Sequence, residues 1–131
     1  MLRSFVSRGR RAVLALSAIA AGACSHLGMG GPSAPDAFIV FRNESLDQAD
    51  VYAVAQGTDL VRIGTVFPGR ADTLRVRSSM LTSGSGVNIV ARLLARSNTP
   101  SSGILPVHAG DFFEVRLAPD GRTLSALPVV R

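Results

Sequence analysis

Few side chains in this 131-residue chain could do metal or cofactor chemistry, and they are scattered. Its two histidines are His26 and His108, and neither belongs to a spacing such as HxxxH that would place two ligands on one metal ion. A site would have to join His108 to Asp111 through loops, and we expect His108 to be a turn residue instead. Phosphate-binding motifs of the Walker type are absent from the sequence. We therefore predict no metal site and no cofactor.

The sequence gives equally little support for a catalytic site. The run Ser83-Gly84-Ser85-Gly86 lacks the order of the GxSxG nucleophile elbow, which also requires a strand-to-helix turn. Glycoside hydrolysis needs two paired carboxylates, but most of the aspartates lie at expected turns, where aspartate is common. Glu44 follows an expected strand, and Glu114 lies on the expected solvated face of another. We predict that the protein is not an enzyme.

Cys24 is the only cysteine, and the stretch before it has a distinctive order. Four arginines come first, and residues 12–23 then carry no charge. This order is typical of a secretory signal peptide. A helix of twelve residues covers about 18 Å, against a membrane hydrocarbon core of about 30 Å. We therefore expect residues 1–23 to direct export and then be removed, rather than to span a membrane.

The segment Ala21-Gly22-Ala23-Cys24-Ser25 resembles the lipobox of bacterial lipoproteins, in which small residues precede an invariant cysteine. The resemblance implies a diacylglycerol joined to Cys24 through a thioether, cleavage before Cys24, and acylation of the new amino group, for example by palmitate. Ala21 stands where that class usually carries leucine. Ser25 stands where many inner-membrane lipoproteins carry aspartate, so the resemblance implies the outer membrane, facing the periplasm.

Physical chemistry supports an anchor at Cys24 independently. One acyl chain binds a membrane marginally, at about 0.8 kcal/mol per buried methylene, and stable attachment needs at least two chains. The alternative is ordinary signal cleavage that leaves Cys24 as a free or buried thiol, although a lone cysteine has no internal disulfide partner. Arg10-Arg11 also resembles a twin-arginine export signal, so the general secretory route and the twin-arginine route both stay open.

The composition of the mature chain argues against a nucleic-acid partner. Removal of residues 1–23 leaves 108 residues, which is enough for one domain with its own core. The whole chain has a net charge of +5, but four of its fourteen basic residues lie in the signal, so the mature chain carries only +1. A near-neutral protein with one tyrosine and no tryptophan offers neither a basic surface nor stacking platforms for bases.

Two regions follow the signal. Residues 24–36 form a lipid-anchored, flexible tether rich in glycine and proline, with a root-mean-square reach of roughly 20 Å. Residues 37–131 carry short runs of Val, Ile, Leu and Phe separated by turn residues every eight to twelve positions. This spacing predicts an all-β domain, a small immunoglobulin-like β-sandwich of seven to eight strands. The likeness is architectural, since the Cys-Trp-Cys core of immunoglobulin domains is absent.

The expected strands follow from alternation between apolar and polar residues. Residues 91–96 are good helix formers, but the sustained alternation of 87–96 favours a strand. Pro106 indicates an edge position for its strand, and one helical turn is expected around Met80 and Leu81. The expected strands are 37–42, 50–56, 60–67, 73–77, 87–96, 103–107, 112–118 and 122–130.

Six arginines fall on the polar faces of these strands, namely Arg62, Arg75, Arg77, Arg92, Arg96 and Arg116. If they converge on one sheet, they form a basic patch for an anionic partner such as lipid headgroups or envelope polysaccharide. The interpretation we favour is that they are spread out and paired with Asp50, Asp72 and Glu114, which keeps strand edges soluble.

These features together predict a lipid-anchored protein of the bacterial cell envelope whose sandwich is a non-enzymatic structural or protein-interaction module. It would touch its partner through loops or an edge strand. The alternative is a module that binds a saccharide or another small molecule among the loops at one end. The expected partners are the membrane, through the anchor, and an envelope protein or polysaccharide.

Overall fold

The computed structural model describes residues 31–56, 59–81, 84 and 86–129. The predicted signal peptide, Cys24 and most of the predicted tether lie outside the described residues, as does part of the run Ser83-Gly84-Ser85-Gly86. Residues 31–36 have no regular secondary structure and lead directly into the first strand.

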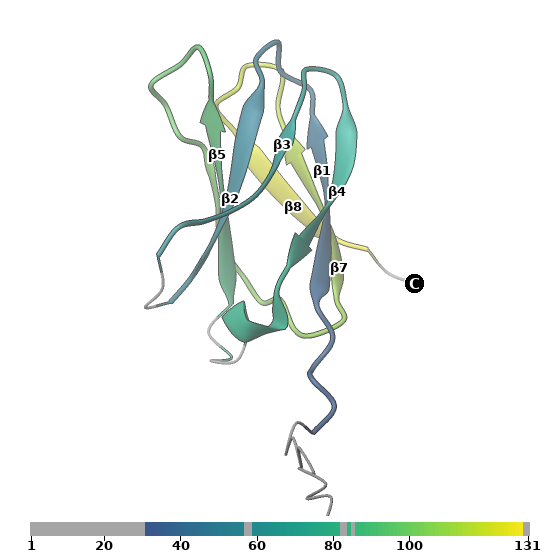
Figure 1. Cartoon of the computed structure of the whole chain (residues 1–131). Helices are drawn as coiled ribbons and strands as arrows, with labels where there is room; N and C mark the ends of the chain where they lie inside the picture. The colour runs from purple at the N-terminus through teal and green to yellow at the C-terminus, as the bar shows by residue number, and fades with distance from the viewer. Residues whose placement is uncertain (1–30, 57–58, 82–83, 85, 130–131) are drawn as a thin grey trace, which may run out of the picture.

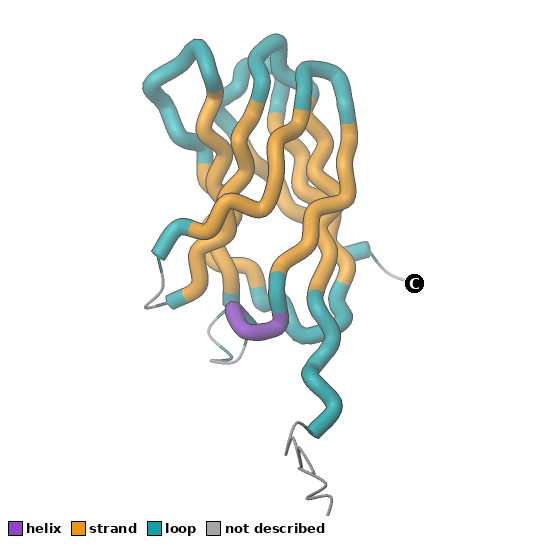
Figure 2. Tube along the Cα trace, viewed as in Figure 1, coloured by secondary structure: helices purple, strands orange, loops and turns teal. Residues whose placement is uncertain are grey.

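Eight strands of the described part form two four-stranded sheets packed face to face (Figures 1 and 2). The prediction of a small sandwich of seven to eight strands is therefore confirmed. The first sheet has the order β4-β1-β7-β8 and the second the order β3-β2-β5-β6. The strands are β1 (Ala37–Asn43), β2 (Ala49–Ala55), β3 (Val61–Val66), β4 (Ala71–Val76), β5 (Val87–Leu93), β6 (Ser101–Leu105), β7 (Phe112–Leu117) and β8 (Leu124–Pro128).

Paired strands run antiparallel, except that β1 and β7 are parallel. The consecutive strands β2 and β3, and likewise β7 and β8, form antiparallel hairpins. A single 3-10 turn, η1 (Ser78–Met80), follows β4 where a helical turn was expected. β6 lies at the edge of its sheet, as Pro106 indicated.

The core lies between the sheets. It follows mainly from β1, β2, β5 and β7, in which buried positions alternate with more exposed ones. Ile39 and Phe41 of β1 belong to one apolar cluster with Val51 of β2 and Ile89 of β5, and all four are fully buried. Removal of this apolar surface from water is the main force that holds the two sheets together. Gly64 of β3 allows a close approach, because a Cβ there would lie 2.5 Å from Cδ2 of Leu74 on β4.

Several predicted strand boundaries are wrong by two or three residues, in β4, β5, β6 and β8. β5 ends at Leu93 instead of Arg96, because residues 94–96 turn away from the sheet to reach other loops. β8 begins at Leu124 instead of Arg122, since the backbone N–H of Arg122 donates to Asp120 within the hairpin turn. β4 begins at Ala71 instead of Thr73, and β6 lies two residues earlier than predicted, at Ser101–Leu105.

The loops gather at two ends of the sandwich (Figure 1). Because β1 and β7 run in one direction and their antiparallel partners in the other, the β1–β2, β3–β4, β5–β6 and β7–β8 loops share one end. We call this the distal end. The opposite end, where residues 31–36 enter β1, is called the tether end and holds the β2–β3, β4–β5 and β6–β7 connections.

Candidate functional site

The histidine singled out in the sequence lies in an exposed turn at the tether end. The backbone N–H of His108 donates to Oδ2 of Asp111 at 2.8 Å, and its Nδ1 lies 3.3 Å from the same oxygen. His108 O in turn accepts from the N–H of Asp111, which confirms the predicted turn. In the part of the chain that the structure describes, no three His, Cys, Asp or Glu side chains are grouped to hold a metal ion.

The two glutamates form surface ion pairs on the outer face of the β4-β1-β7-β8 sheet. Oε1 of Glu114 lies 3.4 Å from Arg42 and from Arg116, and Glu44 also lies 3.4 Å from Arg116. The side chains of Glu44 and Glu114 are each about one third exposed. The prediction that Glu114 lies on a solvated strand face is confirmed.

The arginines are spread over the molecule, as the favoured interpretation expected. Arg62 pairs with Asp50 at 2.7 Å and Arg116 with Glu114. Asp72 was expected to pair with an arginine, but among residues 31–56, 59–81, 84 and 86–129 it makes no ion pair. The six arginines therefore form no single patch.

Arg92 and Arg96 line a cleft of about 350 Å³ near the distal end, which we call the distal cleft. It lies between the outward side of β2 and β5 and the β5–β6 loop, which projects beside the sheet in Figure 1. A second hollow of about 470 Å³ is lined by the same loop and Arg122. The residues that line the distal cleft are Asp50, Tyr52, Arg92, Leu93, Leu94, Arg96, Ser97 and Thr99.

The register of β2 and β5 places an aromatic ring beside a guanidinium in this cleft. Asp50 pairs with Arg92 and Tyr52 with Val90, so the three polar side chains share the outward face. The guanidinium carbon of Arg92 lies 5.8 Å from the centre of the Tyr52 ring, within the range of a cation–π contact. Arg92 makes no ion pair with any described residue, so its charge remains available to a ligand.

Asp50 carries a stable negative charge at the floor of the cleft. Its Oδ1 accepts hydrogen bonds from Oγ1 of Thr65 and from Arg62, both at 2.7 Å. The hydrogen bond from Thr65 is the main cause that holds the pKa of Asp50 below its usual range, and the Arg62 and Arg92 charges add to it. The cleft therefore presents the Asp50 carboxylate, which is paired with Arg62, and the Arg92 guanidinium, which has no ion-pair partner among the described residues.

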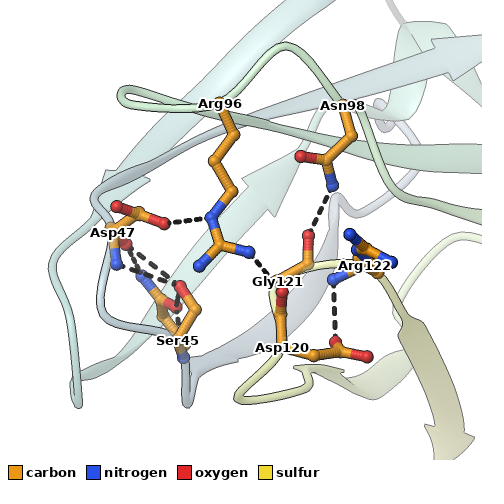
Figure 3. Close-up of polar contacts among 8 residues, drawn as sticks. Ser45, Asp47, Arg96, Asn98, Asp120, Gly121 and Arg122 are labelled. Carbon is orange, nitrogen blue, oxygen red and sulfur yellow. Dashed lines mark hydrogen bonds and ion pairs between the residues drawn. The ribbon is translucent and has the colours of Figure 1, made fainter.

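The β5–β6 loop that borders the cleft is held by bonds to two other distal loops (Figure 3). Nε of Arg96 donates to Oδ2 of Asp47 at 2.6 Å, and its Nη1 donates to the carbonyl of Asp120. Nδ2 of Asn98 donates to the carbonyl of Gly121 at 2.7 Å. Loops from three separate connections are thus joined into one framework.

The buried side chain of Asn43 stabilises this framework of loops from the interior of the domain. Asn43 is fully buried, and its Nδ2 donates to the carbonyls of Asp47 at 2.8 Å and Val66 at 3.0 Å. Its Oδ1 accepts from the backbone N–H and the hydroxyl of Ser45. Every donor and acceptor of the Asn43 side chain is therefore used, and the β1–β2 loop is bonded to the end of β3.

Sequence reasoning correctly placed Arg92 on a polar strand face. It placed Arg96 on the same face, but Arg96 lies in the β5–β6 loop past the end of β5. It missed Tyr52, Asn43 and Asp47. The two-residue spacing of Asn43 and Ser45 is a signal for a turn closed by an asparagine side chain. Tyr52 is the only tyrosine, but no local pattern shows which strand lies beside it.

Comparison with known proteins does not assign this site. No protein-family model matches the chain, and no curated protein sequence matches it. Among the described residues, no helix is both long and apolar enough to cross a membrane.

Proposed function

We propose that the protein is a lipid-anchored protein of the bacterial cell envelope, exported by residues 1–23 and acylated at Cys24. Its β-sandwich serves as a non-enzymatic structural or protein-interaction module, held at the outer membrane on the periplasmic side. The signal-like N-terminal stretch and the lone cysteine support the location.

One structural observation carries the role of interaction module, namely the cross-bonded framework of distal loops. Arg96, Asn98 and Asn43 hold these loops in one arrangement before any partner is present. A surface that is already ordered loses less conformational entropy on binding. The distal surface also lies at the end opposite the tether end, and an anchored domain would expose that end to partners.

The side chains on this surface are of the kind that protein partners use. Tyrosine and arginine are enriched at the centres of protein interfaces, and Tyr52 and Arg92 lie together in the distal cleft. Leu94 at the rim is 76% exposed and adds an apolar contact. We infer that a partner protein places an acidic side chain against Arg92.

The size of the distal cleft favours a second candidate, the binding of a saccharide or another small molecule. Ligand sites commonly occupy about 300 to 1,000 Å³, and the cleft measures about 350 Å³. Its mixture of aromatic, guanidinium, carboxylate and hydroxyl groups suits a polar ligand.

In-cell photo-crosslinking tests the proposal. A photoreactive phenylalanine replaces Leu94 at the cleft in one variant and Leu60 at the tether end in another; both leucines are more than half exposed. We expect one defined protein adduct from position 94 and not from position 60. Addition of Arg92→Glu should abolish the adduct, whereas Arg70→Glu, on the β3–β4 turn outside the cleft, should leave it.

The same variants separate the two candidates. If the position 94 adduct contains envelope polysaccharide instead of protein, the ligand-binding alternative gains support. An adduct that persists at full yield in Arg92→Glu would contradict both assignments to the distal cleft.

A further inference from the structure

An apolar strip lies on the outer face of the β4-β1-β7-β8 sheet at the tether end. Phe38 of β1 pairs with Phe112 of β7, and their rings stack with centroids 5.4 Å apart. Both rings are half-buried, and they lie on the side opposite the buried Ile39. Leu127 and Val129 extend the strip across β8, and they are 61% and 43% exposed. A single exposed apolar residue would need no explanation, but here several apolar residues lie together on one face.

Arginines flank this strip on the β4 side. Arg75 is the register partner of Phe38, and Arg77 lies two residues further along the chain, in extended backbone just past the end of β4 at Val76. Together with Arg62 of β3 they line a hollow of about 150 Å³. Arg77 makes no ion pair within the described part of the chain. We call the apolar strip and these arginines the tether-side face.

Carboxylates near the tether-side face are already paired within the protein. Asp36 lies 3.4 Å from Arg75, and Asp50 lies 2.7 Å from Arg62. Glu114, next to Leu127 in register, is held by Arg42 and Arg116 on the same sheet. Of the three arginines of the face, only Arg77 has no carboxylate partner among the described residues.

The chain enters the domain at this face. Oδ1 of Asp36 accepts from the backbone N–H of Ser78 at 2.7 Å, and Oδ2 pairs with Arg75. The last residue of the predicted tether is thus bound to the domain beside the strip. Asp36 is the twelfth residue after Cys24, and a flexible chain of that length reaches roughly 20 Å.

We propose that the tether-side face lies against the surface of an anionic phospholipid bilayer. This inference rests on the proposed lipid anchor, which would keep the face within reach of the membrane. The phenylalanines, Leu127 and Val129 would enter the interfacial region, where apolar side chains bury area among headgroups and acyl chains. Arg77 and Arg75 would donate to lipid phosphates, for which the planar guanidinium is well suited. The distal end then points away from the bilayer.

The absence of tryptophan from the chain allows a direct test with single-tryptophan reporters. Leu127→Trp marks the tether-side face, and Leu94→Trp, at a residue that is also largely exposed, marks the distal end. The mature lipidated protein, which begins at Cys24, is reconstituted into vesicles of anionic phosphatidylglycerol and neutral phosphatidylcholine, with or without bromine on the acyl chains. Bromine quenches tryptophan only near the acyl region.

We expect brominated vesicles to quench Leu127→Trp strongly and Leu94→Trp weakly, with a blue-shifted emission only for Leu127→Trp. Val129→Trp should repeat the result at a second position. Quenching of Leu127→Trp should fall when Arg77→Glu is added or when the vesicles contain phosphatidylcholine alone.

Flotation of the vesicles distinguishes failure of this inference from failure of the anchor. If the protein floats with the vesicles but Leu127→Trp and Leu94→Trp are quenched equally, or neither is quenched, the proposed contact of the tether-side face with the bilayer is contradicted. The lipid anchor is then still supported. If the protein does not float, the anchor is overturned and this inference with it.

Discussion

Replacement of Asn43 by alanine tests the framework of distal loops at its most buried point. The change removes four hydrogen bonds at once. The carbonyls of Asp47 and Val66 each lose a donor, and the backbone N–H and hydroxyl of Ser45 lose their acceptor. The hydroxyl of Ser45 can still donate to the carbonyl of Asp47, 3.2 Å away, so part of the loss is recovered.

A buried polar group left without a partner costs about 1 to 3 kcal/mol. With the Ser45 hydroxyl satisfied elsewhere, we expect Asn43→Ala to lower the free energy of unfolding by about 2 to 4 kcal/mol. That is a large share of the roughly 5 to 15 kcal/mol that holds a typical domain folded. Urea unfolding followed by circular dichroism measures the change.

Asn88→Ala is the matched control. Its Oδ1 accepts from the hydroxyl of Ser101 on the exposed side of the sheet, where water can replace the lost bond. We expect a loss of about 0.5 kcal/mol, at the low end for a solvent-exposed hydrogen bond. If the two variants unfold at the same urea concentration, the buried framework does not stabilise the fold as argued.

Two further predictions concern the same end of the sandwich. Gly121→Ala should destabilise the protein by about 1 kcal/mol more than Gly69→Ala: both glycines have φ near +67°, but only at Gly121 would a new Cβ lie 2.9 Å from Leu93. Equal losses in thermal unfolding would show that the close approach is unimportant. Asp50, whose pKa is lowered mainly by Thr65, should add stability at neutral pH that disappears as the pH falls from about 4 through the lower folded-state pKa. The stability gap between wild type and Asp50→Asn should therefore close in acid; a gap that widens would mean the opposite sign of shift.

The existence and type of the strands could be predicted from sequence because alternation is a local property. Ala37 to Asn43 alternate between buried and exposed positions with a period of two, and a single strand shows this without knowledge of its neighbours. The ends of β5 and β8 could not be predicted, since Arg96 and Arg122 leave their strands to bond with distant loops or within a turn.

The candidate sites depend on which strands are neighbours, and no local pattern contains that information. Tyr52 meets Arg92 because β2 pairs with β5, and Phe38 meets Phe112 because β1 pairs in parallel with β7. The charge of each residue was evident from its type, and the face it occupies was evident from its position in a strand. Their association into a cleft and a face followed only from the sheet order.

Intact mass spectrometry of the protein extracted from its native membranes tests the central claim most directly. The account predicts a chain that begins at Cys24 and carries the added mass of at least two acyl chains. The Cys24→Ser variant should keep its leader and should no longer be found in the membrane fraction. A native protein recovered from the cytosol with residues 1–23 still attached and an unmodified Cys24 thiol would contradict it.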